Sequence, residues 1–78
     1  MSIGEKLKAM RLKQNFTQDY VAFCLDITQP AYHKMENGKT IINLKRLEEL
    51  AALYNVKVVD ILGSEVWVSG IKYRVSLI

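Results

Sequence analysis

The stretch that decides the fold is residues 17–38, TQDYVAFCLDITQPAYHKMENG. It holds two helix-sized segments, each preceded by a threonine whose hydroxyl can accept a hydrogen bond from a free backbone N–H group of the first helical turn. Thr17 precedes the first segment, which we expect to be helical over 18–25. Thr28 precedes the second, where Pro30 occupies the first turn and its missing N–H costs nothing. Two short helices joined by a tight turn are therefore predicted.

The flanking sequence adds three more helices. Before the pair, Ser2 and Glu5 have the spacing of a capping box that begins an amphipathic helix. After the pair, Asn37 and Gly38 suit the positive φ that ends a helix, and Asn43 caps a longer one. The apolar stripe of that longer helix consists of Leu44, Leu47, Leu50 and Ala51. The five expected helices span about 3–14, 18–25, 29–36, 44–55 and 58–62.

Size and composition describe one small globular domain. The chain has 78 residues, half of them hydrophobic, and none of its apolar runs approaches the ~20 residues that span a bilayer. We therefore expect a cytoplasmic protein without a membrane partner. Cys24 and His33 are each the only residue of their type, so neither an internal disulfide nor a structural metal is expected.

The positive charge is concentrated in the first part of the chain. The net charge is +3, and residues 1–45 carry seven basic and four acidic side chains, whereas residues 46–78 are balanced. A basic face in the segment with the predicted helix pair is consistent with a polyanionic partner. Charge alone does not identify that partner as nucleic acid.

The composition changes after Gly63 and predicts a separate tail. Residues 64–78 are rich in β-branched and aromatic side chains, with Ser69-Gly70 at the place of a turn. We expect a helical domain over 1–63 and a β-hairpin or strand pair over 64–78. Because an isolated hairpin is marginal in water, the tail should pack on the helices or pair with a second copy. The side chains expected at such a dimer interface are Val66, Trp67, Val68, Ile71, Tyr73 and Val75.

The helix pair and its flanks match one family pattern without a gap. The matching residues are Leu7, Arg11, Thr17, Gln18, Ala22, Thr28, Gln29, Glu36 to Lys39, Leu44, Leu47, Leu50, Ala51 and Asp60 to Gly63. On these residues, the segment 3–63 resembles the Cro/C1-type (Xre) helix-turn-helix family of bacterial and phage regulators. The resemblance implies a mainly α fold, a five-helix lambda-repressor-like domain that binds operator DNA as a two-fold dimer. Asp26 departs from the glycine common in the turn, and Tyr20, Phe23 and Cys24 from the usual polar surface of the second helix.

The resemblance also implies roles for particular residues. In the family the outer face of the third helix enters the major groove, where glutamine can pair with adenine and lysine with guanine. The expected base-contacting residues are Gln29, Pro30, His33 and Lys34. Those expected at DNA phosphates are Thr17, Gln18, Thr28, Asn37, Lys39 and Thr40. Arg11 and Glu36 match a structural ion pair between the first and third helices.

Three functional hypotheses remain open at this point. The leading one is a sequence-specific DNA-binding transcription regulator, a repressor that binds a near-palindromic operator as a homodimer. An alternative is the antitoxin of a toxin–antitoxin pair, whose tail or Tyr20 and Phe23 bind a toxin protein. A third is an adaptor that has lost DNA binding, which Gln18, Gln29 and Lys34 argue against. The sequence has one histidine and lacks a glycine-rich phosphate loop, a metal-ligand cluster and a carboxylate pair in a plausible cleft, so we expect neither an enzyme nor a cofactor.

Overall fold

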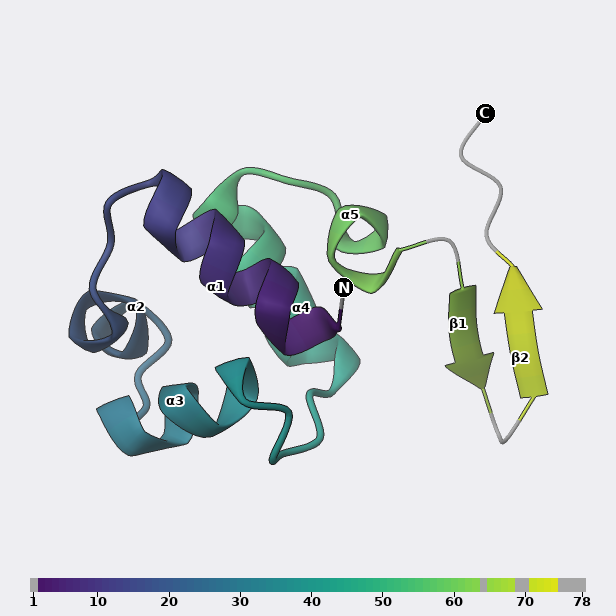
Figure 1. Ribbon diagram of the computed structural model, residues 1–78, viewed down its shortest axis with the longest axis horizontal. Helices are drawn as coiled ribbons and strands as arrows, with labels where there is room; N and C mark the ends of the chain where they lie inside the picture. Colours follow the sequence, from purple (N-terminus) through teal and green to yellow (C-terminus); the bar gives the residue numbers. More distant parts are fainter. Residues whose placement is uncertain (1, 64, 69–70, 75–78) are drawn as a thin grey trace.

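The computed structural model describes residues 2–63, 65–68 and 71–74, with side chains over 2–63 (Figure 1). Five helices follow one another: α1 (Ile3–Lys13), α2 (Gln18–Cys24), α3 (Gln29–Glu36), α4 (Leu44–Tyr54) and α5 (Val58–Leu62). They confirm the expected five-helix domain. Three helices end one residue earlier than predicted, because Gln14, Leu25 and Asn55 are C-caps and not helical residues.

Side-chain caps begin four of the helices, as the sequence predicts. The side-chain oxygens of Ser2, Thr17, Thr28 and Asn43 each accept a hydrogen bond from the backbone N–H three residues later, at 2.8–3.2 Å. Each bond satisfies one of the donors left free at the start of a helix, which stabilises the helix by ~1 kcal/mol. The helix starts are therefore determined by local sequence.

Left-handed residues make the sharp connections between helices. Asn15 precedes α2 with φ 59°, Asp26 lies in the α2–α3 turn with φ 56°, and Asn55 ends α4 with φ 54°. Gly38 follows α3 with φ 68°. Asp26 thus adopts the backbone for which glycine is better suited, and it does so at a conformational cost.

The core sits where all five helices converge. Each helix contributes one fully buried side chain: Leu7, Val21, Tyr32, Leu50 and Ile61. Leu44 is the exception to the predicted stripe, because it begins α4 and remains 62% exposed. The stripe enters the core only one turn later, at Leu47.

Gly4 brings α1 into direct contact with the end of α3. The residue is buried, and a Cβ atom at this position would lie 2.7 Å from the carbonyl carbon of Glu36 and 2.8 Å from the carbonyl oxygen of Met35. Cβ atoms do not come this close to other heavy atoms, so the two backbones can approach only because residue 4 has no side chain. This contact sets the position of α3 against α1.

Two strands follow the helices in the chain. β1 (Glu65–Val68) pairs antiparallel with β2 (Ile71–Arg74), with Glu65 opposite Arg74 and Val68 opposite Ile71. The expected Ser69-Gly70 turn and Val75 lie outside the described residues, as do the side chains of Val66, Trp67, Val68, Ile71 and Tyr73. In the part of the chain that the structure describes, none of the helices has the length and apolar character needed to span a membrane.

Candidate nucleic-acid interface

The α2–α3 pair is held to the domain by its connecting turn. Leu25 caps α2, and the left-handed Asp26 turns the chain so that Thr28 can cap α3 three residues after Leu25. The carbonyl oxygen of Leu25 accepts a hydrogen bond of 3.0 Å from Nη1 of Arg46 on α4. The turn between the two helices is therefore attached to α4, and α3 follows it on the same side of the domain as α2 (Figure 1).

A buried ion pair connects α1 to the last turn of α3. Nε and Nη2 of Arg11 donate to the two carboxylate oxygens of Glu36, at 2.7 and 3.2 Å. Nη1 of Arg11 donates to the carbonyl oxygen of Phe16 at 3.0 Å. Both members of the expected pair are more than nine-tenths buried, which makes the two-pronged geometry important for their stability.

The ion pair keeps Glu36 ionised. Burial favours the protonated acid, but hydrogen bonds from Arg11 and Gln18 outweigh it and lower the pKa of the Glu36 carboxyl. The hydrogen bond to Glu36 correspondingly raises the pKa of Arg11. Glu36 is therefore an acceptor only, and this determines the orientation of the groups that donate to it.

Glu36 also anchors the two glutamines predicted to meet DNA. Nε2 of Gln18, at the start of α2, donates to Oε1 of Glu36 at 3.0 Å. Oε1 of Gln18 then accepts a hydrogen bond of 2.6 Å from Nε2 of Gln29, the first residue of α3. A chain of side chains thus runs from the buried ion pair to the exposed start of α3.

His33 and Asn37 extend this network along α3. Nδ1 of His33 lies 3.4 Å from Oε1 of Gln18. Nδ2 of Asn37 lies 2.9 Å from Nε2 of His33 and also 2.9 Å from the His33 carbonyl oxygen. Four of the predicted DNA-contacting residues, Gln18, Gln29, His33 and Asn37, are therefore joined in one hydrogen-bonded group.

The other predicted contacts are placed individually. The hydroxyls of Thr17 and Thr28 cap α2 and α3, which puts both residues at positive helix ends. Exposed side chains on α3 and in the loop after it account for the rest of the set: Pro30, Lys34, Lys39 and Thr40. All the residues expected to contact DNA bases or phosphates therefore lie on α2 and α3, at their caps or in the loop that follows α3.

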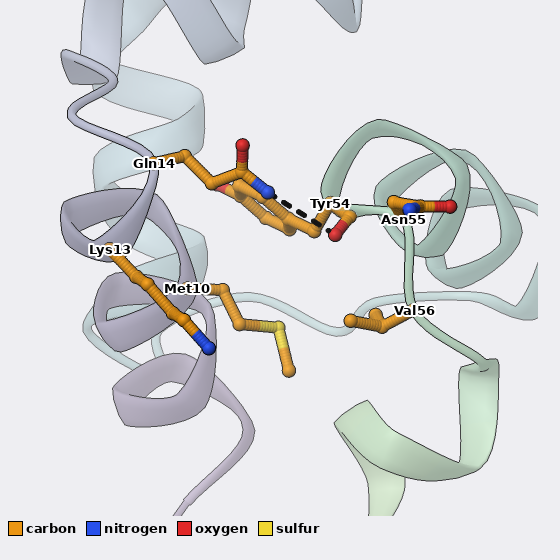
Figure 2. Close-up of a pocket in the computed structure, with 6 residues that line it drawn as sticks. All are labelled: Met10, Lys13, Gln14, Tyr54, Asn55 and Val56. Carbon is orange, nitrogen blue, oxygen red and sulfur yellow. Dashed lines mark hydrogen bonds between the residues drawn. The ribbon is translucent and has the colours of Figure 1, made fainter.

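Two hollows in the surface of the described domain lie apart from this group. The larger, of about 540 Å³, lies between the end of α1 and the α4–α5 turn, where Nε2 of Gln14 donates to the Tyr54 carbonyl oxygen at 3.4 Å (Figure 2). A second hollow, of about 370 Å³, is lined by Ile3, Met35, Ile41 and Thr40 among others. Within residues 2–63, the side chains form no cluster of three or more His, Cys, Asp or Glu residues that could hold a metal ion.

Sequence reasoning missed two contacts that position the helix pair. Arg46 reaches the Leu25 carbonyl, and the buried hydroxyls of Tyr32 and Tyr54 lie 2.7 Å apart. Burial raises the pKa of both tyrosines, so both hydroxyls stay protonated at neutral pH. Arg46 stands three residues after the helix cap Asn43, a position that does not indicate a contact with Leu25. Tyr32 and Tyr54 are 22 positions apart, so no local sequence pattern links them.

Comparison with known proteins bears on the same segment. A family model described as helix-turn-helix matches residues 7–61. The HTH-type transcriptional activator BcrR of Enterococcus faecalis is 31% identical over 65 residues, which are 83% of this chain and 32% of that protein. The chain thus spans about a third of the length of this curated relative.

Proposed function

This chain belongs to the Cro/C1-type helix-turn-helix family, and on that premise we propose that it is a repressor that binds a near-palindromic DNA operator as a homodimer. The family is one of non-enzymatic transcription regulators. The observation that carries the proposal is the 2.6 Å hydrogen bond from Gln29 to Gln18. It joins the starts of α2 and α3 and holds the Gln29 amide in one orientation, in which it can bind the edge of a base.

The hydrogen-bond inventory of Gln29 suits it to read adenine. Its amide has two donor hydrogens and one acceptor oxygen. One hydrogen is used on Gln18, which leaves the second hydrogen for N7 of adenine and the oxygen for its N6 amino group. Because Gln18 is anchored on Glu36, the Gln29 amide is oriented before DNA arrives, and less side-chain entropy is lost on binding.

The remaining contacts divide between bases and phosphates. Lys34 can donate to guanine O6 or N7, and Pro30 can offer only apolar contact, for instance to a thymine methyl. The positive ends of α2 and α3, at Thr17 and Thr28, and the exposed Lys39 and Thr40 suit phosphate oxygens. Discrimination then comes from the bases, at ~1–3 kcal/mol for a good contact, and affinity from the backbone.

Dimerisation would place two α3 helices on one face of the duplex. Half-sites read by such a pair lie about one helical turn, ~34 Å, apart. The antiparallel β1–β2 pair supports a role for the tail, because each strand of a two-stranded sheet has one edge whose backbone groups a second copy could pair with. Removal of residues 64–78 should then lower the mass measured by sedimentation and weaken operator binding.

Selection of duplexes from random DNA, followed by fluorescence anisotropy, tests the proposal. Gln29→Ala should lose preference at one base position of the enriched site, by about 5- to 150-fold. Lys39→Ala should weaken all sequences alike and reduce the salt slope of log K by about 0.9. Lys57→Ala is the matched control, since it removes an exposed lysine outside the helix pair and should change neither quantity.

Two results would overturn this placement of the interface. One is that Gln29→Ala and Lys39→Ala both bind the enriched duplex like the unmodified chain. The other is that random DNA yields no enriched sequence. A promoter reporter decides the direction of regulation: repression lowers its output, whereas the activation named for the Enterococcus relative would raise it.

The exposed aromatic surface of α2 favours a second candidate function. Phe23 is 81% exposed and Tyr20 is 47% exposed, and their i, i+3 spacing makes them neighbours on the surface of α2. Adjacent exposed apolar side chains can form the kind of patch that marks a protein interface. In this candidate the chain is an antitoxin whose aromatic surface binds a toxin protein while the helix pair binds the operator. Co-purification of a second small protein that Phe23→Ser abolishes would support it, and a single purified species would count against it.

A further inference from the structure

The first turn of α4 departs from the usual distribution of charge along a helix. Lys45 and Arg46 stand there one after the other, and this turn contains no acidic residue. Because the N-terminal end of a helix carries partial positive charge, cations at these positions are unfavourable for α4 itself. Lys45 is exposed, whereas the side chain of Arg46 is only 25% exposed. A contact with another element must therefore compensate for the position of Arg46.

That contact lies at the C-terminal end of α2. Nη1 of Arg46 donates to the carbonyl oxygen of Leu25, the C-cap of α2, at 3.0 Å. The end of a helix leaves carbonyl oxygens without partners and carries partial negative charge, and α2 has no basic residue in its own last turn. A cation that is misplaced on α4 is thus well placed for α2. Arg46 supplies from a different helix the donor and the charge that the end of α2 lacks.

The guanidinium group is also directed by a neighbour on its own helix. Oε1 of Glu49 lies 3.3 Å from Nη1 of Arg46, with the i, i+3 spacing that makes two helical side chains adjacent. Leu25 is buried, so water has little access to it. Among the described hydrogen bonds, the one from Arg46 is the one that reaches the Leu25 carbonyl oxygen. The turn therefore depends on this side chain for the pairing of a buried polar group.

The two ends of α3 are held by different elements. Glu36, at the last residue of α3, is bonded to Arg11 of α1 at 2.7 and 3.2 Å. Gln29, at the first residue of α3, follows the turn and stands four residues after Leu25. The bond from Arg46 thus attaches the Gln29 end of α3 to α4, whereas α1 holds the opposite end. Movement of the turn would displace the Gln29 end first.

We propose that Arg46 is a positioning residue for base reading, which fixes the turn between α2 and α3 and thereby sets where the Gln29 end of α3 meets DNA. This inference rests on the proposed function, in which Gln29 reads a base. Without the guanidinium group, the Leu25 carbonyl has to move toward water to regain a partner, and the turn moves with it. A base contact requires its side chain to be held to within ~0.5 Å, whereas phosphate contacts carry no sequence information. Loss of Arg46 should therefore lower discrimination between sequences more than general affinity for DNA.

NMR of the DNA-free chain tests the contact itself. The carbonyl carbon resonance of Leu25 should shift in Arg46→Met and stay constant in Lys45→Met, because only the first variant removes its hydrogen-bond donor. The side-chain amide of Gln29 should shift with it, while the backbone amide of Gly38, beyond the other end of α3, should not. An unchanged Leu25 resonance in Arg46→Met overturns the proposal.

A measurement on the unmodified chain covers the case in which Arg46→Met does not fold. A guanidinium group that is bonded to the Leu25 carbonyl rotates slowly, so its two Nη nitrogens should give separate resonances. One averaged Nη resonance for Arg46 would contradict the contact without any variant.

Binding to two duplexes gives the functional readout. The probes are the enriched duplex and a scrambled duplex of the same composition, and the measured quantity is the ratio of their dissociation constants at one salt concentration. Arg46→Met should lower this discrimination by at least about 5-fold, the lower end of the loss for one base contact. Lys45→Met is the matched control, because it removes the same charge from the exposed neighbouring position and should leave the ratio unchanged. Far-ultraviolet circular dichroism at the assay temperature verifies that each variant is folded.

A double variant separates positioning of Gln29 from a general loss of structure. In a Gln29→Ala background the base contact is already absent, so adding Arg46→Met should lower discrimination by less than it does in the unmodified chain. Equal losses in the two backgrounds, within about 2-fold, would contradict the positioning role.

The remaining outcomes distinguish a direct DNA contact and a failure of the proposed function. If Arg46→Met weakens both duplexes equally and reduces the salt slope of log K by about 0.9 while Lys45→Met does not, Arg46 itself binds a phosphate and the positioning role is wrong. If no duplex is enriched from random DNA, the proposed function fails and the base-reading role of Arg46 fails with it. The NMR experiment then still decides whether Arg46 holds the turn.

Discussion

Glu36 joins three helices, so removing its charge should affect both stability and DNA reading. Glu36→Gln preserves the shape of the side chain but replaces one acceptor oxygen with an NH₂ group that faces the buried Arg11. Arg11 then loses one of its two charged hydrogen bonds, at 2.7 and 3.2 Å, and keeps the bond to the Phe16 carbonyl. We expect a cost of about 3 kcal/mol, at the lower end of the range for breaking a buried pair.

That cost is large for a domain of this size. Five helices over about 60 residues are typically stable by roughly 3–9 kcal/mol. Urea denaturation followed by far-ultraviolet circular dichroism measures the change, with the shift in midpoint converted through the measured slope. Arg11→Met should cost a similar amount, because it leaves the Glu36 carboxylate buried without its cationic partner.

The double variant Arg11→Met/Glu36→Leu provides the decisive comparison. Apolar residues in place of both partners leave no unpaired charge, so the double variant should be more stable than the sum of the single costs implies, by at least 2 kcal/mol. It should nevertheless read DNA poorly, because Gln18 has lost its anchor. Additive costs, within about 0.5 kcal/mol, would refute the description of this pair as a coupled unit.

Three further predictions concern the same domain. Gly4→Ala should destabilise the domain by about 1–3 kcal/mol in urea denaturation, because the added Cβ would meet the backbone of α3, even though alanine favours a helix. Ala9→Gly, at an exposed position of α1, measures the effect of helix propensity alone. A Gly4→Ala variant more stable than the unmodified chain would contradict the close approach of α1 and α3. Asp26→Gly should raise the free energy of unfolding by about 1 kcal/mol, since glycine adopts φ 56° without strain, and an unchanged melting temperature would argue against strain there. The pKa of the Glu36 carboxyl is lowered in the folded protein, so its stabilising contribution is complete above the ordinary value of 4.5 and is lost as the pH falls below it. A pH series of denaturation curves should show this acid dependence in the unmodified chain and not in Glu36→Gln. The same pH dependence in both proteins would count against the prediction.

The local parts of the fold were predictable because their causes are local. Ser2, Thr17, Thr28 and Asn43 begin helices through bonds to backbone only three residues away, and the structure has all four. The left-handed Gly38 after α3 and the tight turn that contains Asp26 were likewise predictable. Leu44 shows the limit of periodicity, because a stripe gives the direction of a side chain but not where the helix enters the core.

The contacts that orient the candidate site were not predictable in the same way. Arg46 and Leu25, or Gly4 and Glu36, meet only after the helices pack, and neither pair has a spacing that points to the other. The family pattern supplied the identities of Gln18 and Gln29 but not the direction of their amides, which depends on the charge of Glu36. His33 and Asn37 stand four residues apart and meet on one face of α3, whereas the contact of His33 with Gln18 joins residues 15 positions apart.

The anchoring of Gln18 on a buried carboxylate has a consequence for genetics. A screen for alleles that have lost control of a promoter would recover substitutions at Arg11 and Glu36, two positions that lie in the interior and need no contact with DNA. Such alleles would resemble surface alleles at Gln29 in phenotype, and only the cellular level of the protein would separate them. Second-site suppressors would differ as well: substitutions that add general stability should rescue the interior alleles, whereas only a changed operator should rescue those at Gln29.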